Sequence, residues 1–388
     1  MPDITLKNQP FDLAFHPSEP VLYSSLLTGE VKAWRYDDAT GETERAWTVR
    51  PTKKTARALG VEGDGKSLWV GGKSGILCRL DAAVGTVLFE KEAAHDSPVN
   101  RVICVNEQLV ASGDDEGVIK FWDSRKPGDA IRTYTQHYDY ISGFSYFEDK
   151  RQLVATSGDG HLSAIDIRSS KAEPLTVSED QEDELLSIAP IKGGSKVVVG
   201  TGLGILTVWN RKLGWGDCVD RIPGHPASVD AIVALTDDCI ATGSEDGLVR
   251  VMQIQPNKFL GVIATHDEYP IERLALDRAG KWLGSVSHDQ CIKLTDVEDL
   301  FVDSDDEDAA MEDSDDSDDD EMGAVVADDA EDDEEEAEGA EEDDKDDSDV
   351  EMEEDEAPKG KLSKRGQGIR AAKHAKAEED EGGFFDDL

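Results

Sequence analysis

Apolar and polar residues alternate along seven short segments of the first 300 residues. Alternation with a period of two is typical of a half-buried β-strand, and helical periodicity is absent over this part of the chain. Aligned on their fifth residues, the segments follow one another at spacings of 46, 42, 43, 44, 43 and 43 residues, which indicates an internal repeat. The segments are EVKAWRYD (30–37), ILCRLDAA (76–83), VIKFWDSR (118–125), HLSAIDIR (161–168), ILTVWNRK (205–212), LVRVMQIQ (248–255) and CIKLTDVE (291–298).

A second apolar stretch precedes each of these segments, as in QLVASG, QLVATS and CIATGS. Turns rich in Gly, Asp and Ser, such as GDDEG, GDG and GSEDG, separate the two, and this composition is typical of β-hairpins. A third apolar stretch lies further upstream, as in FDLAF, VNRVICV and VDAIVAL. Three or four short strands in each of seven units predict an all-β fold, a seven-bladed β-propeller over residues 1–300.

The third unit carries the features of a known repeat. VIKFWDSR, with a histidine upstream and the turn GDDEG, resembles a WD repeat, and the array resembles a seven-bladed WD-repeat propeller. In that family a histidine before the first strand of a blade contacts an acid in the hairpin turn. Four units have such a histidine, and also an acid six residues before the aligned position. The expected pairs are His95 with Glu116, His137 with Asp159, His225 with Asp246 and His266 with Asp289.

The other three units lack both members of the pair. Thr28, Ser74 and Leu203 stand where the acid is expected, and no matching histidine precedes them. If the histidine and the acid form a buried contact, both should be absent together, because a buried polar group without a partner costs about 1–3 kcal/mol. We therefore interpret the four histidines as structural, and not as catalytic or metal-binding groups.

The last unit lacks a fourth strand, because LTDVEDLF runs directly into acidic residues. WD-repeat propellers usually close with an N-terminal strand that completes the final blade. The segment ITLKN (4–8) is the candidate for this strand. Such closure removes an exposed sheet edge.

Residues 60–67, GVEGDGKS, match the phosphate-loop pattern of nucleotide-binding proteins. That loop has to run into a helix whose N-terminus receives the phosphate. In this chain the segment lies in the first hairpin of the second unit and is followed by the strand SLWVGG. We therefore expect no nucleotide site. GTGLG (200–204) resembles a dinucleotide fingerprint, but it too precedes a strand. We expect no cofactor and no enzymatic activity.

The formal net charge of −46 is concentrated in one segment. Residues 303–357 hold 34 acidic residues and a single base, Lys345. Like charges without apolar residues predict disorder, so we expect an acidic disordered tail over 301–358. Such a polyanion is suited to shield or capture basic proteins, although a merely solvating tail is the alternative. Acids follow three residues after Ser304, Ser317 and Ser348, which makes these serines candidate phosphorylation sites.

A basic segment with a terminal FFDDL motif occupies residues 359–388. Lys359, Lys361, Lys364 and Arg365 form a candidate nuclear-import signal. Phe384 and Phe385 lie among acids near the end of the chain. Paired aromatic residues bring no benefit to a disordered terminus by themselves, so we interpret them as a candidate docking motif.

Cysteine usage and hydropathy agree with an intracellular location. The five cysteines are scattered and form no CxxC pair, so neither a zinc site nor a disulfide framework is indicated. The N-terminal residues lack a signal-peptide pattern, and no apolar run approaches the length of a membrane span. We expect a soluble protein with no membrane contact.

The opening QPFDLAFHPSEPVLYSSLLTGEVKAWRYD, the seven units, the acidic tail, the basic segment and the terminal GFFDDL together resemble the fungal Jip-type WD-repeat family, whose animal relative is WD-repeat protein fifty-five. The resemblance covers the whole chain. It implies a nucleolar scaffold in ribosome biogenesis, in particular in pre-rRNA processing for the large subunit. The expected partners are pre-ribosomal or other basic nuclear proteins, with RNA contacted weakly or indirectly, and the chain is expected to be a monomer within a larger complex.

Two other functions fit parts of the sequence. Many WD propellers dock on the adaptor of a cullin-RING ubiquitin ligase through a WDxR motif. Trp122, Asp123 and Arg125 match this motif, and Asp166 and Arg168 form a near match in the adjacent unit. The alternative is that Arg125 merely caps the end of a strand. Histone chaperoning through the acidic tail is the other candidate function.

Overall fold

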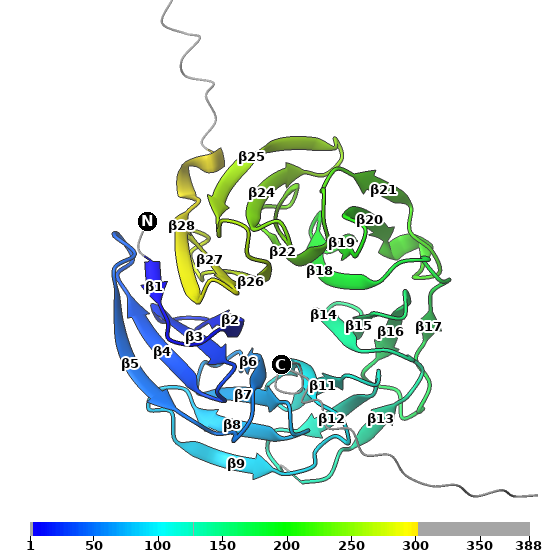
Figure 1. The fold of residues 1–388 in the computed structure, drawn as a ribbon. Coiled ribbons are helices and arrows are strands. Elements are labelled where there is room, and N and C mark those ends of the chain that lie inside the picture. Colours follow the sequence, from blue (N-terminus) through cyan, green and yellow to red (C-terminus); the bar gives the residue numbers. More distant parts are fainter. Residues whose placement is uncertain (1–2, 127, 302–388) are drawn as a thin grey trace, which may run out of the picture. The chain divides into compact units, whose positions relative to one another are not determined.

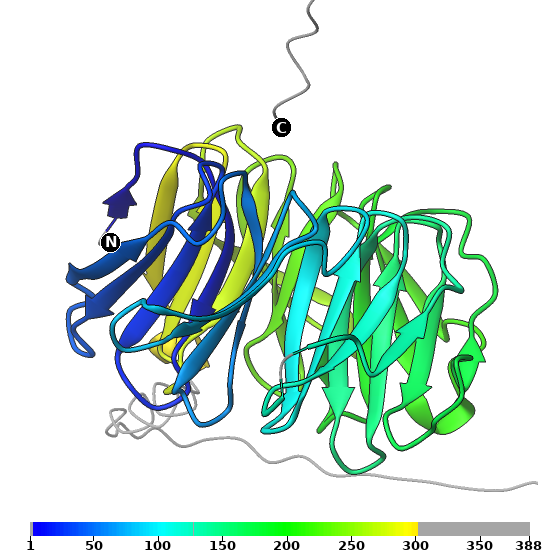
Figure 2. The same ribbon diagram turned by 90° about the horizontal axis from the view of Figure 1, so that it is seen from below.

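The computed structural model describes residues 3–126 and 128–301. These residues form seven four-stranded antiparallel sheets, which are the blades of a ring (Figure 1). In side view the strands run between the two faces of the ring (Figure 2). The seven-bladed propeller predicted from the repeat is therefore confirmed. The helical turns of the described residues are the short 3-10 helices η1 (Arg211–Leu213) and η2 (Glu298–Phe301).

Blades 1 to 4 consist of consecutive strands, ordered from the ring axis outwards. Blade 1 contains β2 (Pro10–Phe15), β3 (Val21–Leu26), β4 (Val31–Tyr36) and β5 (Thr43–Val49). Blade 2 contains β6 (Ala56–Val61), β7 (Ser67–Gly72), β8 (Leu77–Asp81) and β9 (Val87–Lys91). Blade 3 contains β10 (Val99–Asn106), β11 (Leu109–Asp114), β12 (Ile119–Asp123) and β13 (Arg132–Tyr134). Blade 4 contains β14 (Ile141–Phe147), β15 (Gln152–Ser157), β16 (Leu162–Asp166) and β17 (Thr176–Val177).

Blades 5 to 7 continue the same order, except at the outermost strand of blade 7. Blade 5 contains β18 (Leu185–Ile191), β19 (Lys196–Thr201), β20 (Ile205–Asn210) and β21 (Asp220–Pro223). Blade 6 contains β22 (Val229–Ala234), β23 (Cys239–Ser244), β24 (Leu248–Gln253) and β25 (Lys258–Thr265). Blade 7 contains β26 (Ile271–Leu276), β27 (Trp282–Ser287), β28 (Cys291–Asp296) and β1 (Asp3–Thr5).

The N-terminal strand closes the ring. β1 pairs antiparallel with β28, and Ile4 lies opposite Ile292. Both residues belong to one buried cluster at the boundary between blades 7 and 1. The expected closing strand is thus present, but it spans Asp3–Thr5 and not the whole of residues 4–8. The residues that follow it lead into β2.

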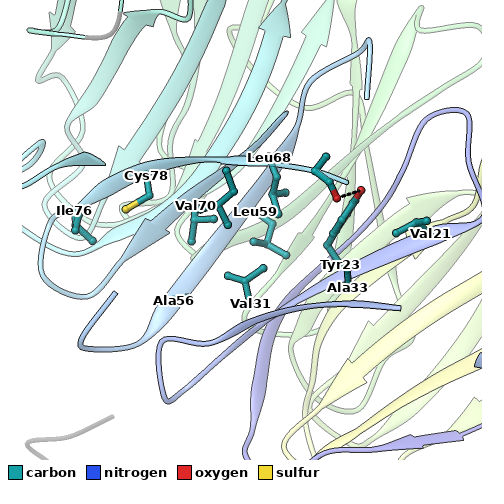
Figure 3. Close-up of a cluster of buried hydrophobic side chains, with 12 residues drawn as sticks. Val21, Tyr23, Val31, Ala33, Ala56, Leu59, Leu68, Val70, Ile76 and Cys78 are labelled. Atoms are coloured by element: carbon teal, nitrogen blue, oxygen red, sulfur yellow. Dashed lines mark hydrogen bonds between the residues drawn. The ribbon is translucent and has the colours of Figure 1, made fainter. Parts of the chain in front are cut away.

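The second strand of a blade is buried on both faces. Every residue of β3, β7, β11, β23 and β27 is buried, because neighbouring blades pack against both sides of these strands. Between blades 1 and 2, for example, Val31 and Ala33 belong to one buried cluster with Leu59, and Tyr23 donates a hydrogen bond to the carbonyl of Ala82 at 3.2 Å (Figure 3). Burial of apolar side chains between blades is the main stabilising term of the ring.

One buried carboxylate joins three blades at the ring axis. Asp12 of blade 1 is 2% exposed and accepts the backbone N–H of Leu59 of blade 2 at 2.7 Å. The guanidinium of Arg273 in blade 7 lies 3.1 Å from its other oxygen. A charge buried in this way is retained because it is both paired and hydrogen-bonded.

Candidate functional site

Blade 3 contains a four-residue polar network. His95 Nδ1 lies 2.7 Å from Asp114 Oδ2, and a carboxylate can only accept, so Nδ1–H is the donor. His95 Nε2 lies 2.6 Å from Ser112 Oγ, which also accepts the Trp122 Nε1–H at 2.8 Å. The expected pairing with Glu116 is wrong. Asp114 ends the buried strand β11 beside the imidazole, whereas Glu116 lies in the turn and donates its backbone N–H to Asp114 at 3.1 Å.

Blades 4 and 7 place the histidine against the acid that the sequence indicated. His137 Nδ1 lies 3.0 Å from Asp159 Oδ2, and His266 Nδ1 lies 2.6 Å from Asp289 Oδ2. Burial alone would raise the pKa of the Asp159 carboxyl, but hydrogen bonds from His137 and from the backbone lower it to about 2. The carboxylate is therefore charged at neutral pH and holds the ring in place.

Blade 6 departs from this arrangement. His225 Nε2 lies 2.8 Å from Thr242 Oγ1, but its buried Nδ1 has no hydrogen-bond partner among the described residues. Asp246 instead binds Arg250 through two contacts of 2.9 and 2.5 Å. The expected pair of His225 with Asp246 is therefore wrong, because a guanidinium fork binds both carboxylate oxygens at once.

The residue at the register position of Arg250 differs between the blades. Arg250 lies opposite Thr242 in the sheet, and the same register position holds Lys120 in blade 3 and Lys293 in blade 7. These two lysines donate to backbone carbonyl oxygens, at 2.9 and 2.6 Å, and leave the acids to the histidines. Burial and the nearby charge of Arg250 lower the pKa of His225 to about 4, against a smaller opposing effect of Asp246.

The backbone hydrogen bond made by the histidine is kept by another residue in two of the blades that lack the histidine. The N–H of His95, His225 or His266 donates to the turn carbonyl of the preceding blade. Leu6 donates in the same way to Gln290, and Gln181 to Gly160. The position is therefore structural in every blade where this bond is described, and each of the four histidines is buried.

The segment GVEGDGKS is a hairpin between β6 and β7. The N–H of Gly65 donates to the carbonyl of Glu62, and the Gly65 carbonyl accepts from His16 Nε2 at 2.9 Å. Lys66 is largely exposed and forms an ion pair with Asp64 at 2.9 Å. A strand follows directly, so no helix N-terminus is available to a phosphate. Among the described residues no group of histidine, cysteine or carboxylate side chains could hold a metal ion.

The two WDxR-like segments have the same geometry. Arg125 binds Asp123 through contacts of 3.0 and 2.8 Å, and Arg168 binds Asp166 through contacts of 2.9 and 2.7 Å. These hydrogen bonds lower the pKa of both carboxyl groups to about 2. Both arginine side chains are more than half exposed. Trp122, by contrast, is buried in the network of blade 3, so it is not available for docking.

Each of the seven blades has a β-bulge in its first strand. In all seven blades the pairing of the first two strands skips one residue near the start of the first strand. A bulge of this kind redirects a side chain out of the sheet. All seven skipped residues line two adjoining cavities of about 330 and 360 Å³. We call them the bulge ring: Phe11, Arg57, Asn100, Ser142, Leu186, Asp230 and Glu272.

One half of the bulge ring contains an internal ion pair. Arg57 Nη1 donates to Asn100 Oδ1 at 2.8 Å and to Asp115 Oδ1 at 3.2 Å. The guanidinium and the carboxylate neutralise each other, so this half offers no net charge to a ligand.

The other half is acidic. Its cavity is lined by Glu184, Asp230, Glu245 and Glu272. Glu272 contacts His288, but within the described residues no cation forms an ion pair with the other three carboxylates. Burial, with the negative charges of Glu272 and Glu245, raises the pKa of the Asp230 carboxyl to about 6. A positive group placed in this cavity would relieve the repulsion.

Comparisons with known proteins bear on the whole propeller. The WDR55 family profile matches residues 1–300. This chain belongs to the WDR55 family. The WD repeat-containing protein JIP5 of Cryptococcus neoformans var. neoformans is 65% identical over 332 residues, which cover 79% of this chain and 88% of the relative. WD repeat-containing protein 55 of Arabidopsis thaliana is 38% identical over 80% of this chain and 88% of its own length, and that of Bos taurus is 35% identical over 77% of both chains.

Solved structures support the fold of this WDR55-family chain. The WD40 repeats of RRP9 superpose with a TM-score of 0.63 at 17% identity, over 76% of this chain and 97% of that one. The structure of U3-55K gives a TM-score of 0.65, also at 17% identity, over 76% of this chain and 98% of that one. At this level of identity the likeness concerns the propeller architecture alone.

Several groups important to the site were not found from the sequence. Arg250 could have been noticed, because the aligned units show lysine at its position in blades 3 and 7. The bulge ring has no sequence signature, since its residues share neither charge nor size. The candidate import residues, phosphorylation sites and terminal phenylalanines lie outside the described residues. No helix within residues 3–126 or 128–301 is long and apolar enough to span a membrane.

Proposed function

We propose that this WDR55-family protein is a non-enzymatic scaffold of nucleolar ribosome biogenesis, acting in pre-rRNA processing for the large subunit. Its propeller binds a basic protein at the acidic half of the bulge ring. The observation that carries the proposal is the group of three carboxylates, Glu184, Asp230 and Glu245, that share a cavity without a paired cation. Ribosomal proteins are basic, so they have the complementary charge. The nucleolar assignment itself rests on the Jip-type resemblance.

Enzyme chemistry is not needed to explain the polar groups of the propeller. The four blade histidines are buried against acids, hydroxyl groups or both, and the exposed lysine of GVEGDGKS pairs with its own hairpin. Burial raises the pKa of the Cys78 thiol to about 12, which disfavours the nucleophilic thiolate. These groups serve packing, and the protein acts by binding.

Affinity purification of the full chain from nuclear extract, with and without nuclease, tests the proposal. We expect large-subunit pre-ribosomal proteins to be retained after nuclease treatment, because the contact is with protein and not with RNA. Recovery of histones as the main partners, or loss of every partner with nuclease, would contradict it. The basic segment is proposed as the import signal, so replacing Lys359, Lys361, Lys364 and Arg365 by Ala should reduce nuclear accumulation.

A second candidate function has its own observation. Arg125 and Arg168 are exposed at matching positions of adjacent blades, as docking on a cullin-ligase adaptor requires. If this docking occurs, Arg125→Ala with Arg168→Ala abolishes recovery of the adaptor and leaves pre-ribosomal partners bound. If the adaptor is absent from the wild-type purification, the two arginines serve only to cap the ends of their strands.

A further inference from the structure

The N-terminal strand and blade 1 enclose a cleft with an unusual charge. It is lined by Thr5, the last residue of β1, and Leu6 to Asn8, which follow it, together with Glu30 and residues of β4 and β5. The cavity measures about 490 Å³. We call it the latch cleft. It does not overlap the bulge ring.

The charged residues that line the latch cleft are Lys7, Lys32, Arg45 and Glu30, with a net charge of +2. The propeller as a whole is acidic, and so are three other cavities on it, including that of the bulge ring. A fifth cavity, beside Arg57, is neutral. Among these five cavities, the latch cleft is therefore the one that attracts an anion.

Lys32 is a buried cation whose usual acceptor is missing. It occupies the register position of Lys120 and Lys293, since it lies opposite Ser24 as they lie opposite Ser112 and Ser285. Those lysines donate to backbone carbonyl oxygens at 2.9 and 2.6 Å. Lys32 is 8% exposed, and the acid near it is Glu30 at 3.5 Å. An ammonium group has three donors, so it retains capacity for a second carboxylate.

Blade 1 also has other donors without acceptors. The buried Nε1 of Trp34, which lines the cleft, has no hydrogen-bond partner among the described residues, and neither does Oγ of Ser24. In blade 3 the equivalent Trp122 donates to Ser112, which is also hydrogen-bonded to His95, whereas in blade 1 Leu6 stands in place of the histidine. The region around the cleft is thus rich in donors, and Lys32 and Arg45 supply positive charge.

We propose that the latch cleft binds carboxylate side chains of this chain's own acidic segment, residues 303–357. The segment holds 34 acids and one base, which is the charge complement of the cleft. It follows directly after blade 7, the blade that β1 completes, so covalent attachment keeps its local concentration high. Docking there holds the polyanion against the closing strand of the ring.

Carbodiimide cross-linking of the full chain tests this proposal, because the reagent joins an ammonium group to a carboxylate in contact with it. We expect cross-links from Lys7, at the rim of the cleft, to acids of residues 303–357. Lys66 is the matched control, because it is 80% exposed but lies in a hairpin of blade 2. Cross-linking of Lys7 to the segment no stronger than that of Lys66 would overturn the proposal.

Two variants show whether the cleft itself is responsible. Arg45→Gln removes an exposed charge from the cleft and should reduce the Lys7 cross-links several-fold, whereas Arg50→Gln, beyond the end of β5, should leave them unchanged. Lys32→Met should act in the same direction, and a thermal melt shows whether that variant remains folded. If Arg45→Gln leaves the cross-links unchanged, the proposal is wrong whatever the state of Lys32→Met.

Mixing isotopically heavy and light chains identifies the source of the carboxylates. Binding within one chain gives cross-links that are heavy–heavy or light–light. Mixed heavy–light cross-links at low protein concentration would contradict the assignment to the chain's own segment and would indicate association of two copies. Neither outcome depends on whether the bulge ring binds a basic partner.

Discussion

Arg250 binds both carboxylate oxygens of Asp246, and His225 Nδ1 beside them has no hydrogen-bond partner among the described residues. Two blades with lysine at the position of Arg250 keep their histidine–acid pairs. The guanidinium of Arg250 therefore explains why blade 6 lacks the histidine–acid pair that blades 3 and 7 have. The consequence is a buried histidine whose pKa lies well below its usual value.

Replacing Arg250 by Lys should return Asp246 to His225. The lysine is expected to bind a backbone carbonyl, as Lys120 does, and the freed carboxylate then accepts the Nδ1–H of the histidine. The pKa of His225 should rise from about 4 toward or above its ordinary value of 6.5. Titration of the His225 ring protons by NMR measures this. An unchanged pKa in Arg250→Lys would show that Arg250 is not the cause.

The low pKa of His225 makes stability depend on pH. Above pH 6.5 the histidine is neutral in both folded and unfolded chains, so its contribution is constant. Between pH 6.5 and about 4 the unfolded chain binds a proton that the folded chain does not. The free energy of unfolding therefore decreases as the pH is lowered through this range. Urea unfolding at several pH values should show a shallower fall for His225→Gln than for the wild type. Equal slopes would contradict the assignment.

The two acids of the blade 3 turn should differ in their effect on stability. Asp114→Ala leaves the buried His95 without its partner and should lower the free energy of unfolding by about 1–3 kcal/mol. Glu116→Ala is the matched control and should change it by less than about 0.5 kcal/mol. Denaturant unfolding of the two variants decides between them, and a larger loss for Glu116→Ala would restore the pairing expected from the sequence.

The closing strand should be needed for the whole ring. Ile4 is buried against Ile292, so Ile4→Ala is expected to cost about 2–5 kcal/mol. Deletion of residues 1–8 should cost more, since blade 7 then loses a strand and the ring loses its closure. Thermal melts compare these variants with Lys258→Ala, an exposed residue of β25 that should melt like the wild type. A deletion variant that also melts like the wild type would disprove the closure.

The strands were predictable because burial of one face imposes a period of two that can be read directly. The contacts of individual polar groups were not. Asp114 and Glu116 lie two residues apart in one turn, and only the three-dimensional path of β11 shows which of them meets His95. The bulges could not be predicted from the sequence for a similar reason. A bulge changes the direction of a side chain but does not require a particular residue type at that position. The acidic half of the bulge ring could therefore be recognised only in the folded chain.

The most direct test of the central claim is binding of basic pre-ribosomal proteins by full-length variants of the bulge ring. Glu184→Gln with Glu245→Gln removes two unpaired carboxylates, and Glu107→Gln, an exposed acid in the loop between β10 and β11, is the control. The acidic tail is present in every chain, so its contribution cancels. We expect the double variant to lose the pre-ribosomal partners and the control to retain them at wild-type level. Equal retention by all three proteins would contradict the assignment of the bulge ring as the binding surface.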